Sequence, residues 1–341
     1  MRLGPRPLAF ALAGLIALAA GPSAPLAQSR SRAPEPIKVT ATAIDRFSRN
    51  EPDQRRFGAL EFRGGLVLAS ETERFGGLSG LSIEPDGQKF LALSDRGNWV
   101  RGRILVNGDR PTGIADAELA PVLGANGRPL ASSGWYDTEA LAHDGGTLYV
   151  GIERVQRLVR LDYGSDGLAA RARTLATPAG IRELPSNQGI ESLAFVPKPL
   201  PLGGTLIALS ERGLDANGNI RGFLIGGPSP GTFSVKRSND FDVTDAALTP
   251  DGNLLILERH FSFLRGVGMR IRRVPLSDVK PGAVLEGTVL IEAGNAHQID
   301  NMEALAAHRN AAGETILTIL SDDNLSRLQR TLLLRFAIVG D

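Results

Sequence analysis

The sequence predicts an all-β chain that folds as a single β-propeller of four-stranded antiparallel blades. Three observations support this: a motif that recurs five times, strand-like runs between Pro/Asp/Gly turns, and a composition with 40 glycines and 21 prolines. Abundant glycine and proline suit many short strands joined by tight turns better than a helical bundle. A regular repeat also favours stacked supersecondary units over a pair of β-sandwiches.

Each copy of the motif contains an acidic or small residue, a short apolar run and a turn. The copies are GLSGLSIEPDG at 77–87, DTEALAHDGG at 137–146, GIESLAFVP at 189–197, VTDAALTPDG at 243–252 and NMEALAAHR at 301–309. A strand rich in Leu, Ile and Val follows each copy, and a carboxylate closes that strand. The copies begin roughly 50–60 residues apart, somewhat above the period of familiar propeller blades.

Two further strand-like runs complete each of the earlier repeats, whereas the last repeat offers three strands and ends in TLLLRFAIV. The run LEFRGGLVLAS at 60–70 can supply the missing outer strand. This pairing of N-terminal and C-terminal strands closes the ring and leaves no large open edge. The prediction is therefore five blades, with six as the alternative if 36–58 and 96–136 contain a degenerate blade.

The first residues have the pattern of a secretory signal peptide. Arg2 and Arg6 precede the apolar run LAFALAGLIALAAG and the small-residue stretch PSAPLAQS. The apolar run is shorter than the roughly 20 residues that span a bilayer. We expect a signal peptide at 1–27, a solvated lead-in at 28–56 and the propeller at 57–341. A periplasmic or secreted monomer, without membrane insertion after cleavage, is the corresponding prediction.

Charge and composition narrow the classes of function. The net charge is +1 and the basic residues are scattered, which disfavours nucleic acid as a partner because such binding needs a basic face. The sequence has no cysteine, so disulfides, thiolate metal sites and a cysteine nucleophile are excluded. Glycine-rich stretches lack the P-loop lysine, no G-x-S-x-G elbow occurs, and we expect no organic cofactor.

The acids of the repeated motif are the first candidates for a functional site. By alignment, Glu139, Glu191, Asp245 and Glu303 occupy equivalent positions, and Ser79 takes that position in the first copy. Their carboxylates would converge at one mouth of the propeller and repel one another unless a cation compensates. Ca²⁺, which binds six to eight oxygens, is the candidate cofactor. We expect all four to ligate metal, and Glu139, Glu191 and Glu303 to be catalytic.

A second charged pattern closes the next strand of four repeats. It consists of Asp95-Arg96, Glu153-Arg154, Glu211-Arg212 and Glu258-Arg259. Neighbouring strand residues point to opposite faces, so each arginine is placed to pair with a carboxylate of another blade. Alternatively the arginines bind substrate, since guanidinium donates two hydrogen bonds to phosphate or carboxylate. His260, beside the last pair, is the candidate general base or else a packing histidine.

Several motifs in order resemble one known family. The segments GGLSGLSIEPDGQKFLALSDRG, DTEALAHDGGTLYVGIER, NQGIESLAFVP and QIDNMEALA are similar to the family described as esterase-like activity of phytase, from about residue 57 to the end. The family consists of exported bacterial propeller domains. The resemblance implies phosphoester hydrolysis and carries over Glu139, Glu191 and Glu303 as candidate site residues.

Two functions follow as hypotheses. The first is an exported hydrolase of a phosphoric or related ester, with Ca²⁺ as its candidate cofactor, in which the arginines hold the anionic substrate. The second is a non-catalytic periplasmic propeller that binds a ligand or a protein partner, with the charged positions joining neighbouring blades. Fold alone does not separate these functions.

Overall fold

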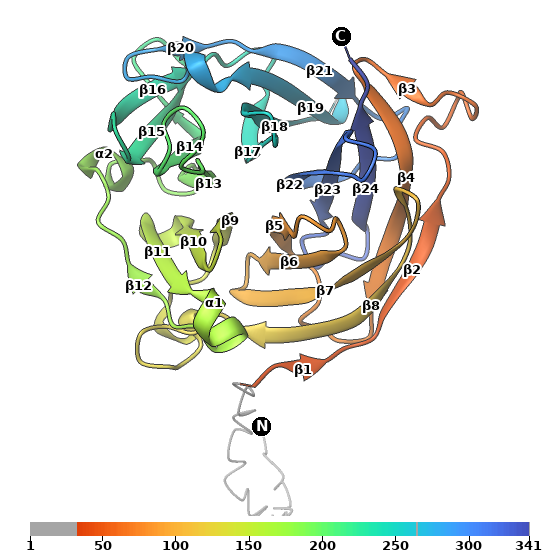
Figure 1. The fold of residues 1–341 in the computed structure, drawn as a ribbon, viewed down its shortest axis with the longest axis horizontal. Helices are drawn as coiled ribbons and strands as arrows, with labels where there is room; N and C mark the ends of the chain where they lie inside the picture. The colour runs from red at the N-terminus through yellow and green to blue at the C-terminus, as the bar shows by residue number, and fades with distance from the viewer. Residues whose placement is uncertain (1–32, 264, 341) are drawn as a thin grey trace, which may run out of the picture. The chain divides into compact units, whose positions relative to one another are not determined.

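The computed structural model describes residues 33–263 and 265–340, and within them the chain forms a five-bladed β-propeller. The inner strands of the five blades surround the centre of the ring (Figure 1). The prediction of five antiparallel blades is confirmed. The signal peptide predicted at 1–27 lies outside the described residues. Among those described, no helix is long and apolar enough to cross a membrane.

Blades 1 and 2 come first along the chain. Blade 1 contains, from the centre outward, β5 (Leu78–Ile83), β6 (Lys89–Ser94), β7 (Asn98–Asn107), β8 (Arg110–Pro121) and the short β1 (Glu35–Pro36). Blade 2 contains β9 (Thr138–Asp144), β10 (Thr147–Ile152), β11 (Arg157–Asp162) and β12 (Arg173–Thr174). In each blade the chain therefore runs outward from the centre by consecutive hairpins.

Blades 3 and 4 repeat this order. Blade 3 contains β13 (Ile190–Phe195), β14 (Thr205–Leu214), β15 (Ile220–Gly226), β16 (Gly231–Val235) and β20 (Val284–Leu285), which pairs parallel to β16. Blade 4 contains β17 (Asp242–Leu248), β18 (Asn253–Ser262), β19 (Gly266–Pro275) and β21 (Thr288–Ala293). The parallel β20 arises because the segment between β19 and β21 reaches back to the neighbouring blade.

Blade 5 closes the ring with strands from both ends of the chain. It contains β22 (Asn301–Arg309), β23 (Thr315–Asp322), β24 (Thr331–Ile338), β4 (Leu60–Ser70) and β2 (Val39–Ile44), and β3 (Arg56–Phe57) pairs with β4. The antiparallel ladder between β24 and β4 confirms the predicted closure by residues 60–70. This ladder ties the two ends of the chain together through backbone hydrogen bonds.

The short helices all lie in connections. They are α1 (Tyr163–Asp166), α2 (Ala179–Arg182) and four 3₁₀ turns at Leu130–Ser133, Glu153–Val155, Gly167–Ala169 and Leu276–Asp278. The third of these turns directly follows α1, and the second begins at one of the repeated acids. Helices therefore position loops in this fold and add little to its core.

The propeller begins earlier than residue 57. Within the expected lead-in, β1 and β2 extend two blades, and Phe47 is completely buried against the rings of Phe57 and Phe336. The charge and proline content of the segment suggested solvation, but β2 pairs with β4 as a further antiparallel strand of blade 5. Residues 35–56 are thus part of the domain.

The hydrophobic core lies between adjacent blades. Leu93 of blade 1 packs with Leu141 and Val150 of blade 2, and Leu81 packs with Leu320 of blade 5 across the closing joint. Each sheet buries both faces in this way, which explains the near-continuous apolar runs of β6, β14 and β18. The blade ends that surround the ring centre are free of this packing and can carry polar residues.

Candidate functional site

Every inner strand carries a β-bulge near its first residues. The residue left without a partner on the second strand is Ser79, Glu139, Glu191, Thr244 or Glu303, in blades 1 to 5 respectively. A bulge interrupts the ladder and re-aims one side chain. The local geometry therefore singles out the same position in all five blades, and three of the five residues there are glutamates.

Asp245 is not equivalent to these glutamates, which corrects the alignment by one residue. It lies one position past the bulge, paired with Leu257, and Thr244 is the bulged residue. Its carboxylate accepts backbone N–H bonds from Ala246 at 2.8 Å and from Leu305 of blade 5 at 2.7 Å. Burial raises its pKa well above the ordinary value. The side chain thus joins two inner strands, and its predicted role as metal ligand has no geometric support.

The two bulges without an acid also join neighbouring blades. The Ser79 hydroxyl donates to the carbonyl oxygen of Thr138 in blade 2 at 2.6 Å. The Thr244 hydroxyl donates to the carbonyl oxygen of Met302 in blade 5 at 3.0 Å. Hydroxyl residues at this position therefore hold inner strands together, whereas the three glutamates leave their carboxyls for other contacts.

The second strands bring another set of charges to the same end of the ring. On each second strand, one residue pairs with the residue just before the bulge. The residue that follows it is Asp95, Glu153, Glu211, Arg259 or Asp322, in blades 1 to 5 respectively. Together with the bulged glutamates they form what we call the acid cluster: Asp95, Glu139, Glu153, Glu191, Glu211, Glu303 and Asp322. Mutual repulsion among these carboxyls contributes to their raised pKa values.

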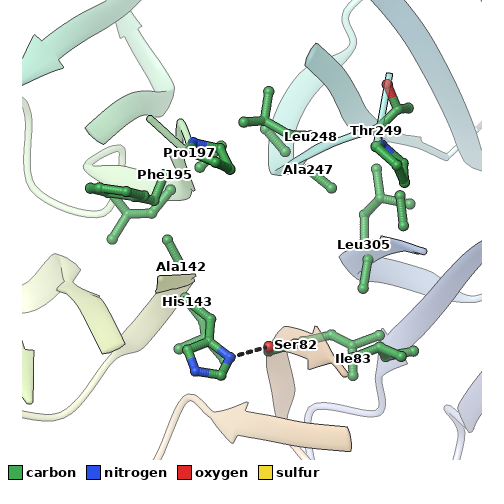
Figure 2. A pocket seen from close by; sticks show the side chains of 18 of the residues that line it. Ser82, Ile83, Ala142, His143, Phe195, Pro197, Ala247, Leu248, Thr249 and Leu305 are labelled. Carbon is green, nitrogen blue, oxygen red and sulfur yellow. Dashed lines mark hydrogen bonds between the residues drawn. The ribbon is translucent and has the colours of Figure 1, made fainter. Parts of the chain in front are cut away.

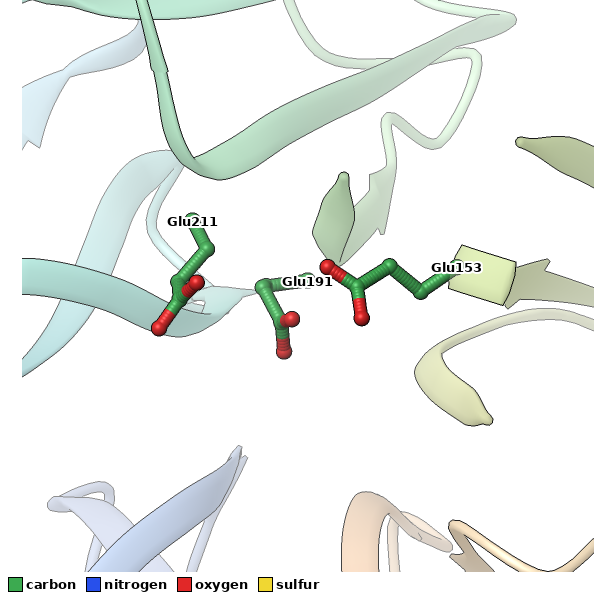
Figure 3. Close-up of side chains that lie close together, drawn as sticks. All are labelled: Glu153, Glu191 and Glu211. Atoms are coloured by element: carbon green, nitrogen blue, oxygen red, sulfur yellow. The ribbon is translucent and has the colours of Figure 1, made fainter. Parts of the chain in front are cut away.

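Three members of the acid cluster converge most closely. The carboxylate oxygens of Glu153, Glu191 and Glu211, one from each, lie within 4.8 Å of one another. Figure 3 shows the three side chains reaching toward a common region from blades 2 and 3. Glu153 accepts a hydrogen bond from the backbone N–H of Gly189 at 2.7 Å. Only Glu191 of these three was predicted as a catalytic or metal residue; Glu153 and Glu211 were predicted to pair with arginines.

Burial dominates the electrostatics of the cluster. Burial raises the pKa of Glu191 and of Glu139 well above the ordinary value, and repulsion from neighbouring carboxylates raises both further. Burial also raises the pKa of Glu211 to about 7 and that of Asp322 to about 8. Groups that titrate near neutral pH can both take up and release protons under working conditions.

Arg259 supplies positive charge at the edge of the cluster. Its Nη2 lies 3.7 Å from Oε1 of Glu211 and 3.5 Å from Oε1 of Glu303. These contacts join blades 3, 4 and 5, as predicted for an inter-blade arginine. They also place a partly exposed guanidinium beside two carboxyls, where it can meet an anionic substrate.

Glu258 does not form the predicted inter-blade pair. Its carboxylate is completely buried and accepts hydrogen bonds from Nε of Arg270 at 2.7 Å and from Nε of Arg272 at 2.8 Å, both on the adjacent strand of its own blade. The acid-arginine pattern is shifted by one residue in blade 4, so Arg259 takes the position that an acid occupies elsewhere.

The other three predicted arginines differ in their surroundings. Arg154 stacks over the ring of Tyr136 at 4.4 Å, and Nε of Arg212 lies 3.5 Å from Asp242 of blade 4. Arg96 is exposed and adjoins Asp95. Burial raises the pKa of Asp95 to about 6, and the positive charge of Arg96 limits this rise. Substrate binding by all four arginines stays a prediction.

His260 points away from the cluster. Its ring packs edge-on against Phe241 with centroids 4.7 Å apart, and burial and the charge of Arg265 lower its pKa. Alternation along β18 sends Arg259 and His260 to opposite faces. The structure therefore supports the packing interpretation of this histidine rather than the general base.

A cavity of about 930 Å³ adjoins the acid cluster and shares Arg259 and Glu303 with it. Arg49 and Arg330 also line this cavity, and sequence reasoning did not identify them. Neither belongs to a repeated motif, because Arg49 comes from the N-terminal segment and Arg330 from the connection between β23 and β24. The spacing of the repeated motifs along the chain therefore gives no indication of these two arginines.

The opposite end of the inner strands has a different character. A second cavity, of about 440 Å³, is lined there mainly by Leu, Ala and Pro side chains (Figure 2). The polar contact drawn in it is between Oγ of Ser82 and Nδ1 of His143, at 3.0 Å. The acid cluster therefore lies at one end of the inner strands, and this mainly apolar cavity lies at the other.

Comparison with known proteins supports one family assignment. Among solved structures, glutaminyl cyclase from Myxococcus xanthus aligns at 11% identity with a TM-score of 0.42, covering 90% of this chain and 100% of that chain. The PQQ-bound aldose sugar dehydrogenase from Streptomyces coelicolor aligns at 13% identity with a TM-score of 0.41, covering 89% of this chain and 99% of that chain. None of the curated proteins matches. The family model described as esterase-like activity of phytase matches residues 73–325, most of the chain. The chain therefore belongs to the family of esterase-like activity of phytase.

Proposed function

We propose that the chain is an exported hydrolase of phosphoric or related esters, with its active site at the acid cluster. The observation that carries the proposal is the convergence of Glu153, Glu191 and Glu211 within 4.8 Å. Buried carboxyls that repel one another destabilise the fold unless something compensates them. Clusters with such perturbed pKa values are typical of functional sites.

The donor set suits a hard divalent cation such as Ca²⁺. Carboxylate oxygens are the ligands that Ca²⁺ prefers, and Glu153, Glu191 and Glu211 would hold it. Elsewhere in the acid cluster, Oδ1 of Asp95 is buried and has no hydrogen-bond partner. A cation bound there would polarise a phosphoryl oxygen and acidify a bound water.

The chain's own residues can supply the remaining chemistry. In hydrolysis the oxygen of water bonds to phosphorus, the bond from phosphorus to the alcohol oxygen breaks, and a proton passes from the water to the alcohol. A carboxyl of the cluster outside the three cation ligands, such as Glu139, whose pKa burial raises well above the ordinary value, is suited to hold that proton in transit. Arg259, beside Glu211 and Glu303, is placed to bind the charged phosphoryl oxygens.

The contacts of Arg259 also favour the second candidate function, a non-catalytic binding propeller. Arg259 reaches carboxyls of two other blades, as an inter-blade contact does in repeat proteins. In that case the charged residues would stabilise the ring, and their removal would lower its stability. The two candidates thus differ in what a substitution in the cluster does.

Hydrolysis assays on the purified chain without residues 1–27 test the proposal. Release of p-nitrophenol from p-nitrophenyl phosphate and p-nitrophenyl acetate is followed after EDTA treatment and during titration with Ca²⁺. We expect turnover of the phosphate ester that Ca²⁺ restores. Absence of turnover for both esters, with a Tm that neither EDTA nor Ca²⁺ changes, would show that the metal-assisted hydrolase is wrong.

Glu191→Gln separates the two candidate functions. Gln keeps the shape but neither binds a cation as strongly nor carries a proton, so we expect kcat/KM to fall roughly 100-fold or more. The control is Glu183→Gln at an exposed position. Full activity in Glu191→Gln would remove this residue from the mechanism.

A further inference from the structure

The large cavity beside the acid cluster is lined by both charged and apolar side chains. Arg259 and Glu303, a member of the cluster, line it together with Arg49 and Arg330. Phe261 and Leu328 line the same cavity. A volume of about 930 Å³ lies at the upper end of the range for small-molecule sites. Because it adjoins the proposed site of hydrolysis, its lining bears on which ester is bound.

The charged part of the lining includes arginines that the fold holds in place. Nη1 of Arg330 donates to Oε1 of Gln298 at 3.1 Å, and Nη2 donates to the carbonyl oxygen of Ile299 at 3.1 Å. Nε of Arg49 donates to the carbonyl oxygen of His297 at 3.0 Å. Guanidinium groups that are already positioned lose less conformational freedom when they bind an oxyanion.

The lining of the cavity also includes two large, exposed apolar side chains. Phe261, near the tip of the β18–β19 hairpin, is 66% exposed, and Leu328, in the β23–β24 connection, is 94% exposed. Single exposed apolar residues are common on protein surfaces. Here two of them, from connections in different blades, line one cavity, so a ligand's apolar group could cover both at once.

We propose that this cavity selects an amphiphilic substrate, a phosphoric monoester of an apolar alcohol. Its phosphate binds toward Arg259 and Arg330, and its alkyl or aryl group packs against Phe261 and Leu328. The inference rests on the proposed function for the reaction, but the specificity it assigns is new. A hydrophilic polyanion would gain nothing from Phe261 and Leu328, and its additional charges would meet the carboxyls of Asp300 and Glu303, which pair with Arg330 and Arg259.

A matched pair of substrates tests the selectivity. Ethyl phosphate and hexyl phosphate have leaving groups of the same chemical type and differ by four methylenes. Release of inorganic phosphate gives KM for each. Each buried methylene contributes up to about 0.8 kcal/mol, so we expect hexyl phosphate to have a KM at least about tenfold lower. Equal KM values for the two esters would overturn the proposal.

Variants of Phe261 and Leu328 test whether these two side chains cause the difference in KM between the esters. Phe261→Ser and Leu328→Ser are expected to raise KM for hexyl phosphate about tenfold and to leave ethyl phosphate within about twofold. Phe263→Ser is the matched control, because Phe263 lies on the same hairpin, is 100% exposed and does not line the cavity. A change in Phe263→Ser as large as that in Phe261→Ser would indicate a general surface effect and would contradict the assignment.

Binding measured without turnover separates this inference from the proposed function. Hexylphosphonate and ethylphosphonate have a P–C bond in place of the ester bond and are titrated by calorimetry. If neither ester is hydrolysed, the proposed function fails. A preference for hexylphosphonate that is lost in Phe261→Ser and weakened in Arg330→Gln would still support the cavity. Equal affinity for the two phosphonates would overturn it.

Discussion

A completely buried and a half-buried carboxyl group on neighbouring blades show opposite electrostatics. In blade 4, Glu258 has no exposed surface and lies between the guanidinium groups of Arg270 and Arg272, which are each 3% exposed. In blade 3, Glu191 is surrounded by the carboxyls of Glu139, Glu153 and other acids, and burial and repulsion raise its pKa well above the ordinary value. One carboxylate is paired within its sheet, and the other is surrounded by like charge.

The difference separates stability from function. A paired buried charge holds its neighbours in place, and removing one partner leaves the others uncompensated. A buried acid among acids lowers the stability of the empty site and becomes useful when a cation or a proton is bound there. The ring can be held together by groups such as Glu258, so its fold does not explain the acid cluster.

The largest effect is expected for Glu258→Gln. The substitution leaves two buried guanidinium groups without a counter-charge, so the free energy of unfolding should fall by about 3–5 kcal/mol. Urea denaturation followed by circular dichroism measures this. The control is Glu286→Gln, which breaks the exposed pair with Lys236 and should cost less than about 1 kcal/mol. Equal effects in the two variants would contradict the contrast drawn here.

A smaller effect is expected from pH. The pKa values of Asp95, Glu211 and Asp322 are raised to about 6, 7 and 8, above ordinary values near 4. Raised pKa values favour the protonated folded state, so this stability is fully present below about pH 4 and is lost as the pH rises through 6 to 8. In EDTA, unfolding free energy should therefore fall between pH 5 and pH 8.

Comparison with Glu211→Gln isolates this pH effect from other titrating groups. The variant's fall in unfolding free energy between pH 5 and pH 8 should be smaller by about 1–3 kcal/mol, because one pKa unit corresponds to about 1.4 kcal/mol. Ca²⁺ at pH 8 should restore stability to the unsubstituted chain. Parallel pH curves for the two proteins would show that Glu211 does not titrate as described.

The smallest effect on stability is expected for Glu191→Gln. Removing a carboxyl that its neighbours repel should change the free energy of unfolding in EDTA by less than about 1 kcal/mol, with a slight gain at pH 8. Urea denaturation at pH 8 measures it beside Glu258→Gln. A loss as large as that in Glu258→Gln would identify Glu191 as a structural residue and favour the non-catalytic function.

The repeats predicted the blades well and the site less well. The alternation of apolar runs and turns marks each strand, and the ladder between β24 and β4 lies where the run at 60–70 was expected. Blade 4 departs from the alignment by one residue, since Thr244 is bulged and Arg259 takes the position of an acid. A bulge adds one residue to a strand, so side chains of residues that align in sequence can point in different directions.

The sequence by itself determined the class of fold, the number of blades and the set of acids from which a site could be built. These depend on local patterns of apolar residues, turns and charge that each repeat contains. Only the tertiary structure decided that Glu153 and Glu211 join Glu191, that Glu258 is paired within its own sheet, and that Arg49 and Arg330 line the neighbouring cavity. Such contacts form where separate blades and connections meet in space. The spacing of residues along the chain therefore does not indicate which side chains become partners across a blade boundary.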